Sequence, residues 1–329
     1  MKLLITGAAG FIGSNFVRYW LDKYPKDNIR VLDKLTYAGH KENLRGLKID
    51  FIKGDICDPK VVTKAMAGVN VVVHFAAESH VDRSVVGPDV FIHTNIIGTQ
   101  VLLQAALQAK VKLFHHVSTD EVFGALPLGK LAAKFTEKTA YDPHSPYSAA
   151  KASSDHLVRA WYHTYGLPVT ITNTSNNYGP YQDPEKLIPR FITNLLTGQK
   201  VPLMGKGENV RDWIHVSDHC AGVALVIQTA LKNPKIIGQT FCLGGNSERT
   251  NLQVTKEILK ILKKDASWIT PIPHRPGHDA RYAIDSSKAK RILGWKPKHT
   301  FSAGLVQTVS WYKQNSWWWQ PLKGKNPFA

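Results

Sequence analysis

The sequence predicts an α/β protein with a Rossmann-type, doubly wound parallel sheet and a smaller mixed α/β lobe. Three observations lead to this prediction: apolar runs alternate with helix-like stretches through the first half, a glycine-rich turn follows the first run, and this rhythm ends near residue 174. Continuous apolar strands separated by helices are typical of a parallel sheet covered on both faces. Because ligands of such sheets bind beyond the carboxyl ends of the strands, functional residues are expected there.

The first half of the chain contains six candidate strands with helices between most of them. The expected strands are Lys2–Thr6, Ile29–Asp33, Ile49–Lys53, Val69–Phe75, Lys112–Ser118 and Val169–Asn173. The expected helices are Phe11–Tyr24, Pro59–Met66, Asp89–Ala109 and Ser148–Tyr165. A helical crossover is the usual connection between parallel neighbours, so this order supports the predicted sheet.

The turn "T-G-A-A-G-F-I-G", residues 6–13, joins the first strand to the first helix, with Gly7, Gly10 and Gly13 in a G-x-x-G-x-x-G spacing. Glycines let the backbone turn sharply and approach a pyrophosphate, and the helix N-terminus adds unpaired N–H groups and a positive dipole end. A purely structural turn is the alternative, but the flanking strand and helix favour dinucleotide binding. Phe11 and Ile12 complete this expected cofactor turn.

Acidic residues follow the next two strands. Asp33 lies 20 residues beyond Gly13, where a carboxylate would accept hydrogen bonds from the ribose hydroxyls of NAD. It would repel the 2′-phosphate of NADP, although the positive charge of the adjacent Lys34 weakens this preference for NAD over NADP. Asp55 follows the third strand, where an adenine edge could be read. NAD is therefore the expected cofactor, and its remaining expected contacts are Lys34, Ile56 and Ala76.

The fifth strand ends in "S-T-D-E-V-F-G", residues 118–124, with a hydroxyl and two adjacent carboxylates at Thr119, Asp120 and Glu121. Neighbouring acids repel and a turn needs only one, so a solvated turn is the ordinary interpretation of such a stretch. Successive side chains of a strand face opposite sides, so both acids reach one ligand only if the backbone bends. Gly124 permits such a bend.

"P-Y-S-A-A-K", residues 146–151, places Tyr147 and Lys151 four positions apart, on one face of a helix. A nearby ammonium is predicted to lower the pKa of the tyrosine from about 10, which would make Tyr147 a general base. Lys151 would also bind the nicotinamide ribose. Alone, such a pair is usually a surface contact; downstream of a dinucleotide turn, catalysis is favoured.

Composition and charge limit the partners and the location. The chain has 329 residues and a formal charge of +17, which favours anionic ligands. The basic residues are scattered, so we expect no nucleic acid partner. The three cysteines are far apart, which argues against a disulfide framework or a metal site. We find no signal-peptide pattern and no apolar stretch near bilayer length, and therefore expect a cytoplasmic protein with no membrane partner.

These motifs together resemble the extended short-chain dehydrogenases/reductases that act on nucleotide sugars. Longer blocks are more specific and resemble the dTDP-glucose 4,6-dehydratase family. They are "DKLTYAG" (33–39), "AAESHVDRS" (76–84), "SPYSAAKASSDHLVRAW" (145–161), "SNNYGPYQDPEKLIP" (175–189), "NVRDWIHVSDHC" (209–220) and "RPGHDARYAID" (275–285). The resemblance runs from residue 1 to about 300.

The resemblance implies a redox-neutral reaction in three steps, with NAD tightly bound and recycled. Tyr147 takes the proton of the sugar 4-hydroxyl, which Thr119 holds, while hydride leaves C4. Glu121 then matches the base for the C5 proton, and Asp120 the acid for the departing 6-hydroxyl. Hydride returns to C6 and gives a 4-keto-6-deoxy sugar. Close carboxylates do not ionise independently, so an acid and a base can coexist at neutral pH.

The resemblance also implies a NAD-binding domain over residues 1–174, with later segments packing back onto it, and a nucleotide-sugar-binding domain over 175–329. Arginine forks suit a diphosphate, and Arg211 and Arg275 match those ligands, although Arg211 could instead pair with Asp212 or a surface acid. The other expected substrate contacts are His80, Arg83, Asn176, Glu185, Lys186, Leu187, Pro202, Asn246 and His278. A homodimer through helices Asp89–Ala109 and Ser148–Tyr165 is implied as well.

Several alternatives remain open. Met204 stands where the family usually has an aromatic residue, which leaves the nucleotide base open between thymidine and uridine, cytidine or guanosine. A nucleotide-sugar 4-epimerase or decarboxylase is the other enzymatic interpretation, and the Asp120–Glu121 pair disfavours it. A cofactor-sensing protein without catalysis is a further possibility, which the intact Tyr147 and Lys151 oppose.

Overall fold

The computed structural model describes residues 1–129, 133–273 and 279–323. Its main sheet has seven strands in the order β10-β6-β5-β4-β1-β2-β3, and every neighbouring pair is parallel. The predicted Rossmann-type fold class is therefore confirmed. The strand order reverses between β1 and β4, which is the switch point where such sheets bind ligands.

The strands lie close to their expected positions. The main sheet consists of β1 Lys2–Thr6, β2 Asn28–Asp33, β3 Asp50–Lys53, β4 Val71–His74, β5 Leu113–Thr119, β6 Val169–Thr174 and β10 Thr240–Leu243. The register pairs Thr6 with His74 and Thr119 with Thr174. The carboxyl ends of the central strands therefore line up along one edge of the sheet.

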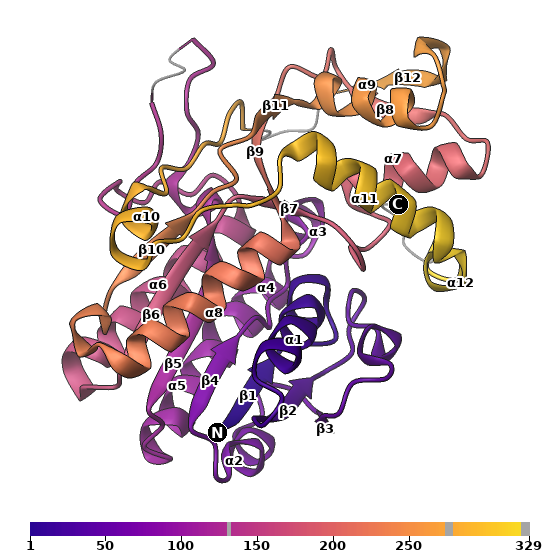
Figure 1. Ribbon diagram of the computed structural model, residues 1–329. Helices are drawn as coiled ribbons and strands as arrows, with labels where there is room; N and C mark the ends of the chain where they lie inside the picture. The colour runs from indigo at the N-terminus through magenta and orange to yellow at the C-terminus, as the bar shows by residue number, and fades with distance from the viewer. Residues whose placement is uncertain (130–132, 274–278, 324–329) are drawn as a thin grey trace.

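Helices cover both faces of this sheet, because its strands alternate apolar side chains toward two cores. Leu3 and Ile5 of β1 pack under α1 (Phe11–Lys23) and α8 (Val216–Lys232), whereas Leu4 faces the opposite core. That second core lies under α2 Pro59–Met66, α5 Gly98–Gln108 and α6 Pro146–Tyr165. Figure 1 shows α1 and α8 on the near face of the sheet and α5 and α6 behind it.

The helix predicted over Asp89–Ala109 is continuous but not uniform. It consists of α4 Asp89–Phe91, a π-helical turn at 92–97 and α5. Asp89–Gln108 is long and apolar enough, by length and composition, to cross a bilayer, so the expectation that no stretch reaches that length is wrong by this criterion. In the fold, α5 lies in the helical layer, where Leu102 and Leu103 are fully buried against the sheet.

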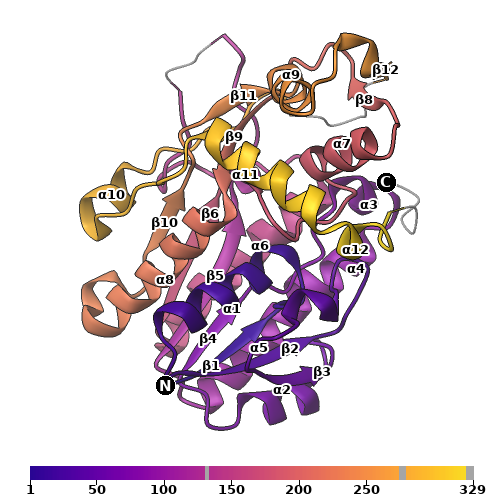
Figure 2. The same cartoon turned by 45° about the vertical axis from the view of Figure 1, so that its right-hand side comes forward.

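The smaller lobe lies beyond the carboxyl ends of the main strands (Figures 1 and 2). It contains the sheet β11-β9-β7 and the parallel pair β12-β8. Its elements are β7 Asn176–Tyr178, α7 Leu187–Leu196, β8 Val201–Met204, β9 Val210–His215, β11 Glu248–Thr250, α9 Asn251–Ile261, β12 Ile269–Ile272, α11 Phe301–Gln314 and α12 Ser316–Trp319. Helix α3 Val81–Val86 follows β4, and helix α10 Ser287–Leu293 packs through Ala289 on the core of the main sheet. Although they follow residue 174, β10 and α8 belong to the main sheet and its helical layer.

The tryptophans near the chain end join the two lobes. Trp318 and Trp319 are buried, whereas Trp317 is 47% exposed. The indole Nε1 of Trp318 donates to Asn43 Oδ1 at 2.6 Å, in the loop after β2. This contact fixes α12 of the smaller lobe against the sheet domain.

Candidate active site

A cleft runs along the carboxyl ends of β1, β2, β4 and β5, and the smaller lobe forms its other wall. Its lining includes most of the residues predicted for cofactor and catalysis: Gly7, Gly10, Phe11, Ile12, Gly13, Asp33, Lys34, Asp55, Ile56, Ala76, Thr119, Asp120, Glu121, Tyr147 and Lys151. Residues far apart in the sequence therefore meet at one site.

The glycine turn forms one end of the cleft. Gly7 has a φ of 70°, and a Cβ there would lie 2.5 Å from the backbone nitrogen of Ala76, so only glycine fits. Helix α1 begins after Gly10 without a side-chain cap and without an acidic residue in its first turn. Its first N–H groups therefore face the cleft unneutralised, which fits a pyrophosphate.

Asp33 ends β2 with its carboxylate held by the backbone. Its oxygens accept hydrogen bonds from Ala9 N at 2.9 Å and Leu35 N at 2.8 Å, and burial raises its pKa. The fixed carboxylate of Asp33 can accept hydrogen bonds from the two hydroxyls of a ribose. Lys34 is paired with Asp55 at 2.8 Å, so its charge is not available for a 2′-phosphate. The cleft therefore fits NAD.

The bend that both acids require begins at Asp120. Strand β5 ends at Thr119, and Asp120–Phe123 form one 3₁₀ turn, closed by Gly124 at a φ of 81°. Thr119 Oγ1 accepts from the backbone N–H of Glu121 at 3.3 Å. Successive side chains of a 3₁₀ turn are spread around its axis by roughly a third of a turn, so Asp120 and Glu121 can both reach the cleft.

Asp120 has the environment of a protonated acid. It is fully enclosed, and its Oδ2 has no hydrogen-bond partner within the described ranges. Burial, and then the charges of Glu121 and Asp212, raise its pKa well above the usual range of a carboxyl. This is the protonation state that the predicted acid role needs.

Tyr147 and Lys151 lie on the first turns of α6, whose start is fixed by a capping box between Ser145 and Ser148. Burial and the charge of Glu121 raise the pKa of Tyr147 well above its usual value, although its hydrogen bond with Thr119 opposes this. The predicted lowering by Lys151 is therefore wrong for this arrangement. The lysine Nζ donates to Val117 O at 2.8 Å instead, so its position is set by strand β5.

The smaller lobe contributes a second wall. Asn176 and Lys186 line the cleft, and the buried Oδ1 of Asn176 has no hydrogen-bond partner in the part of the chain that the structure describes. Arg211 on β9 donates to Val210 O and Asp279 O and stacks over Tyr282 at 4.3 Å. Its charge acts on Asp120, so it lies near the acid pair. Arg275 and His278 lie outside the described residues.

Other predicted substrate residues do not line this cleft. His80 and Arg83 approach Glu185 Oε2 at 3.8 and 3.6 Å, and burial raises the pKa of Glu185 to about 7. Leu187 begins α7 and packs on the core of the small lobe.

Two further predicted residues lie elsewhere in the smaller lobe. Pro202 lines a separate cavity beside Arg190 and Trp319. Asn246 accepts a hydrogen bond from Lys134 at 2.8 Å. These placements follow from long-range packing, which a local motif does not encode.

The cleft also has polar walls that the sequence analysis did not single out. They include Thr36, Tyr37, Glu78, Ser79, Ser118, Ser175, Gln182 and Asp183. Most lie inside the blocks that carry the family resemblance, at 33–39, 76–84 and 175–189, so block membership was the available signal. Asp183 is held by His40 at 3.1 Å.

Comparison with known proteins gives consistent results. Residues 4–308 match the family model described as GDP-mannose 4,6 dehydratase. The dTDP-glucose 4,6-dehydratase of Mycolicibacterium smegmatis is 50% identical over 326 residues, covering 98% of this chain and 96% of the relative. The structure of the dTDP-glucose 4,6-dehydratase of Streptomyces venezuelae, with NAD bound, has a TM-score of 0.94 at 48% identity and covers 98% of this chain and 100% of that one. A UDP-glucose 4-epimerase of Thermotoga maritima is also similar, with a TM-score of 0.88 at 31% identity, covering 95% and 99%.

Proposed function

Since this chain belongs to the dTDP-glucose 4,6-dehydratase family, we propose that it converts dTDP-D-glucose into dTDP-4-keto-6-deoxy-D-glucose and water as an NAD-dependent hydro-lyase. The observation that carries the proposal is the acid pair: Asp120 and Glu121 line the same cleft as Tyr147 and Lys151, and Asp120 is buried in a site that favours its protonated form. An epimerase needs no such pair.

The first step oxidises C4. Burial keeps the Tyr147 phenol neutral in the cofactor-free protein, and the positive charge of bound NAD would favour its phenolate. This phenolate accepts the proton of the 4-hydroxyl, which the neighbouring Thr119 orients. Bound NAD supplies the hydride acceptor for C4, a positive charge in the cleft and, once reduced, the hydride donor for C6. Lys151 lines the cleft and would hold the nicotinamide ribose. The resulting 4-keto group makes the hydrogen on C5 acidic.

The second step eliminates water across C5 and C6. Glu121 takes the proton from C5, and Asp120 gives its proton to the 6-hydroxyl, which leaves as water. The 4-keto-5,6-ene sugar then accepts hydride at C6 and a proton at C5 from Glu121, which regenerates the base. Asp120 recovers its proton from solvent, because burial favours its neutral form. Tyr147 releases to solvent the proton that it took from the 4-hydroxyl, so all atoms balance and no external oxidant is consumed.

Substrate binding uses the smaller lobe. Arg211, with Arg275 and His278, holds the diphosphate, and the unpartnered amide oxygen of Asn176 accepts from a sugar hydroxyl. Lys186 lines the same wall, fixed by its bond to Ser79 O at 3.2 Å. We assign no direct substrate contact to the remaining predicted residues, because the cleft lining does not include His80, Arg83, Glu185, Leu187, Pro202 or Asn246.

Mass spectrometry of nucleotide-sugar products tests the proposal. The protein is incubated with dTDP-, UDP-, CDP- and GDP-glucose. Loss of one water from dTDP-glucose, with weaker conversion of the others, is expected. A product of unchanged mass with an inverted C4 would identify an epimerase instead, and loss of water from another nucleotide sugar alone would move the substrate to that nucleotide.

Replacing Asp33 by asparagine should weaken NAD binding and reduce the preference for NAD over NADP. A hydrogen bond to a charged group contributes about 1.5–3 kcal/mol, so the Kd for NAD should rise on the order of 10- to 100-fold. Calorimetric titration of cofactor-stripped protein measures both cofactors. Asp50→Asn, at the start of the neighbouring strand β3, is the control. Unchanged affinity in the Asp33 variant would exclude the ribose contact.

We also propose a homodimer through the predicted helices. Large apolar side chains on α3, α4 and the following π-helical turn are exposed: Val85, Val86, Val90, Ile92 and Ile97. Exposed apolar side chains that cluster in this way favour a partner in water, and a second copy of the same helices would supply one.

Ile92→Glu should therefore produce a monomer. Ile92 is 49% exposed, and burying a glutamate across a two-fold interface would place two like charges together. Light scattering after size-exclusion chromatography measures the mass against the chain mass of 36.7 kDa. Val306→Glu, at 51% exposure on α11, is the matched control and should leave the dimer intact. An Ile92 variant that stays dimeric contradicts this interface.

A cytoplasmic location fits the chemistry of the chain. Cys57, Cys220 and Cys242 are all free thiols, as expected in a reducing compartment. The product, a nucleotide-bound 4-keto-6-deoxy sugar, is of the kind that epimerases and reductases consume in deoxysugar biosynthesis, of which rhamnose formation is one case.

A further inference from the structure

Helix α6 carries a third polar residue in line with the two catalytic ones. Tyr147, Lys151 and Asp155 follow each other at four-residue intervals, so they lie along one face of the helix. Tyr147 and Lys151 line the cleft, whereas Asp155 is completely buried behind them. The proposed mechanism gives Asp155 no role. A buried carboxylate is costly unless its environment compensates the charge.

Four polar side chains surround the Asp155 carboxylate and compensate its charge. Asp155 Oδ2 accepts hydrogen bonds from Ser118 Oγ at 2.9 Å, Tyr141 OH at 2.7 Å and Asn173 Nδ2 at 3.4 Å. Oδ1 lies 3.2 Å from His116 Nε2. Burial opposes ionisation, but these contacts and the charge of Lys151 outweigh it and lower the pKa of Asp155. Asp155 is therefore a carboxylate anion in the interior.

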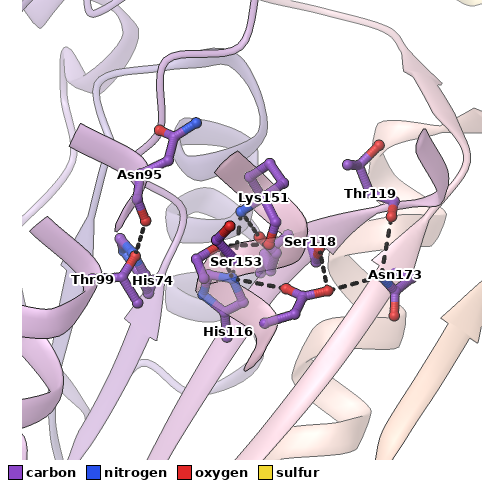
Figure 3. A network of polar contacts seen from close by, with 12 residues as sticks. His74, Asn95, Thr99, His116, Ser118, Thr119, Lys151, Ser153 and Asn173 are labelled. Carbon is purple, nitrogen blue, oxygen red and sulfur yellow. Dashed lines mark hydrogen bonds and ion pairs between the residues drawn. The ribbon is translucent and has the colours of Figure 1, made fainter. Parts of the chain in front are cut away.

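The negative charge of Asp155 favours the protonated form of Lys151. Its Nζ donates to Val117 O at 2.8 Å and lies 3.5 Å from His116 Nε2, as Figure 3 shows. Burial lowers the pKa of Lys151 to about 8 even though the charge of Asp155 opposes this lowering. Without the anion, the ammonium would lose its proton near neutral pH.

The other titratable groups that face Lys151 do not replace Asp155. They are His74 on β4, His116 on β5, and Tyr147 and Arg159 on α6. Burial lowers the pKa of both histidines, so they are neutral at physiological pH. Tyr147 is a neutral phenol, and Arg159 is itself a cation.

The same network also fixes the catalytic turn. Asn173 Nδ2, which contacts Asp155, donates to Thr119 O at 3.0 Å, and Ser118 directly precedes Thr119 (Figure 3). Tyr141, the third donor to Asp155, receives a hydrogen bond from Arg159 at 3.0 Å. One carboxylate therefore links the end of β5, the end of β6 and the catalytic face of α6.

We propose that Asp155 is a positioning residue: it is the buried counter-charge that keeps Lys151 protonated, and its partners hold the end of β5 that presents Thr119. Its activity readout rests on the proposed function, because Lys151 must be charged to bind the nicotinamide ribose. Its effect on the charge of Lys151 does not depend on any substrate.

The test is Asp155→Asn, which keeps the shape and removes the charge. The pKa of Lys151 should fall by about one unit, the lower end of the range of about 1–3 units for a neighbouring opposite charge, because Lys151 and Asp155 are joined through His116 Nε2, at 3.5 Å and 3.2 Å. The protonated lysine is the active form. The pH at which kcat falls on the basic side of the pH–rate profile should therefore decrease by the same number of pH units as the pKa of Lys151. KM should change little, because Asp155 does not reach the cleft.

Asp218→Asn is the matched control. Asp218 on α8 is also buried, and accepts from Lys298 N and His299 N at 3.0 and 2.9 Å outside the cleft. This control should lose stability without moving the basic limb. A uniform loss of kcat at every pH in Asp155→Asn, with the limb unmoved, would mean a merely structural role and would overturn the proposal.

A direct titration separates this proposal from the proposed function. The ¹⁵N-lysine NMR signal of Lys151, assigned by its disappearance in Lys151→Met, reports protonation without substrate. Should Asp155→Asn not fold, Asp155→Ser removes the same charge with a smaller side chain that still forms hydrogen bonds, and it should shift the pKa of Lys151 in the same direction. An unshifted Lys151 in the folded variants refutes the counter-charge, whether or not the protein dehydrates dTDP-glucose.

Discussion

Replacing Glu121 by glutamine should stop the reaction after the first oxidation, with reduced cofactor accumulating on the enzyme. Glutamine has the size of glutamate but does not accept the C5 proton, so elimination loses its base while Tyr147 and Thr119 stay in place. General-base catalysis contributes about 10²–10⁴-fold, and kcat for dehydration should fall by that range. Near-ultraviolet absorbance in a single turnover measures the reduced cofactor directly.

Glu257→Gln serves as the control for this variant. Glu257 on α9 pairs with Arg249 at 3.6 Å, away from the cleft lining, and its replacement should leave turnover normal. The Glu121 variant should bind substrate as well as the parent protein. If it dehydrates dTDP-glucose at the ordinary rate, another group removes the C5 proton, and the role given to Glu121 is wrong.

Tyr147→Phe should fail one step earlier. The phenol is the acceptor for the 4-hydroxyl proton and is hydrogen-bonded to Thr119, so its removal should reduce kcat about 10³-fold. No reduced cofactor should appear, in contrast to Glu121→Gln, because oxidation itself is blocked. Stopped-flow absorbance distinguishes the two variants in one experiment.

Tyr162→Phe tests whether this effect is specific. Tyr162 lies on the same helix α6 but packs on the core beneath the sheet, so its hydroxyl should be dispensable. Rapid formation of reduced cofactor in Tyr147→Phe would show that another base starts the reaction, and would leave Tyr147 without its proposed role.

The fold was predictable because its signals are local. Continuous apolar runs such as Val169–Asn173 mark strands that are buried on both faces, and β6 lies within one residue of that range. The gathering of the expected cofactor and catalytic residues in one cleft was predictable for the same reason, since most of them follow strands whose carboxyl ends meet at one edge. The strand β10, in contrast, joins the sheet from residue 240, and such pairing depends on contacts that no local pattern encodes.

The direction of flexible side chains was not predictable. The spacing of Tyr147 and Lys151 fixes their shared helix face, but the four-carbon stem of the lysine turns toward Val117 O, so burial rather than the ammonium controls the tyrosine pKa. Gly124 permits a bend after Asp120, but the sequence alone does not show that the bend forms. The 3₁₀ turn at Asp120–Phe123 depends on how the end of β5 packs in the folded protein. Asp155 was not predicted as a functional residue, because no local sequence pattern shows that its side chain is buried.

The central claim is that one cleft holds cofactor and sugar together, so that the hydride removed from C4 is the hydride delivered to C6. Incubation with dTDP-glucose deuterated at C4 tests this most directly, with NMR and mass spectrometry of the product. Deuterium should appear in the C6 methyl group of the same sugar molecule. A product methyl group without the label, or with hydrogen drawn from solvent in its place, would contradict the account.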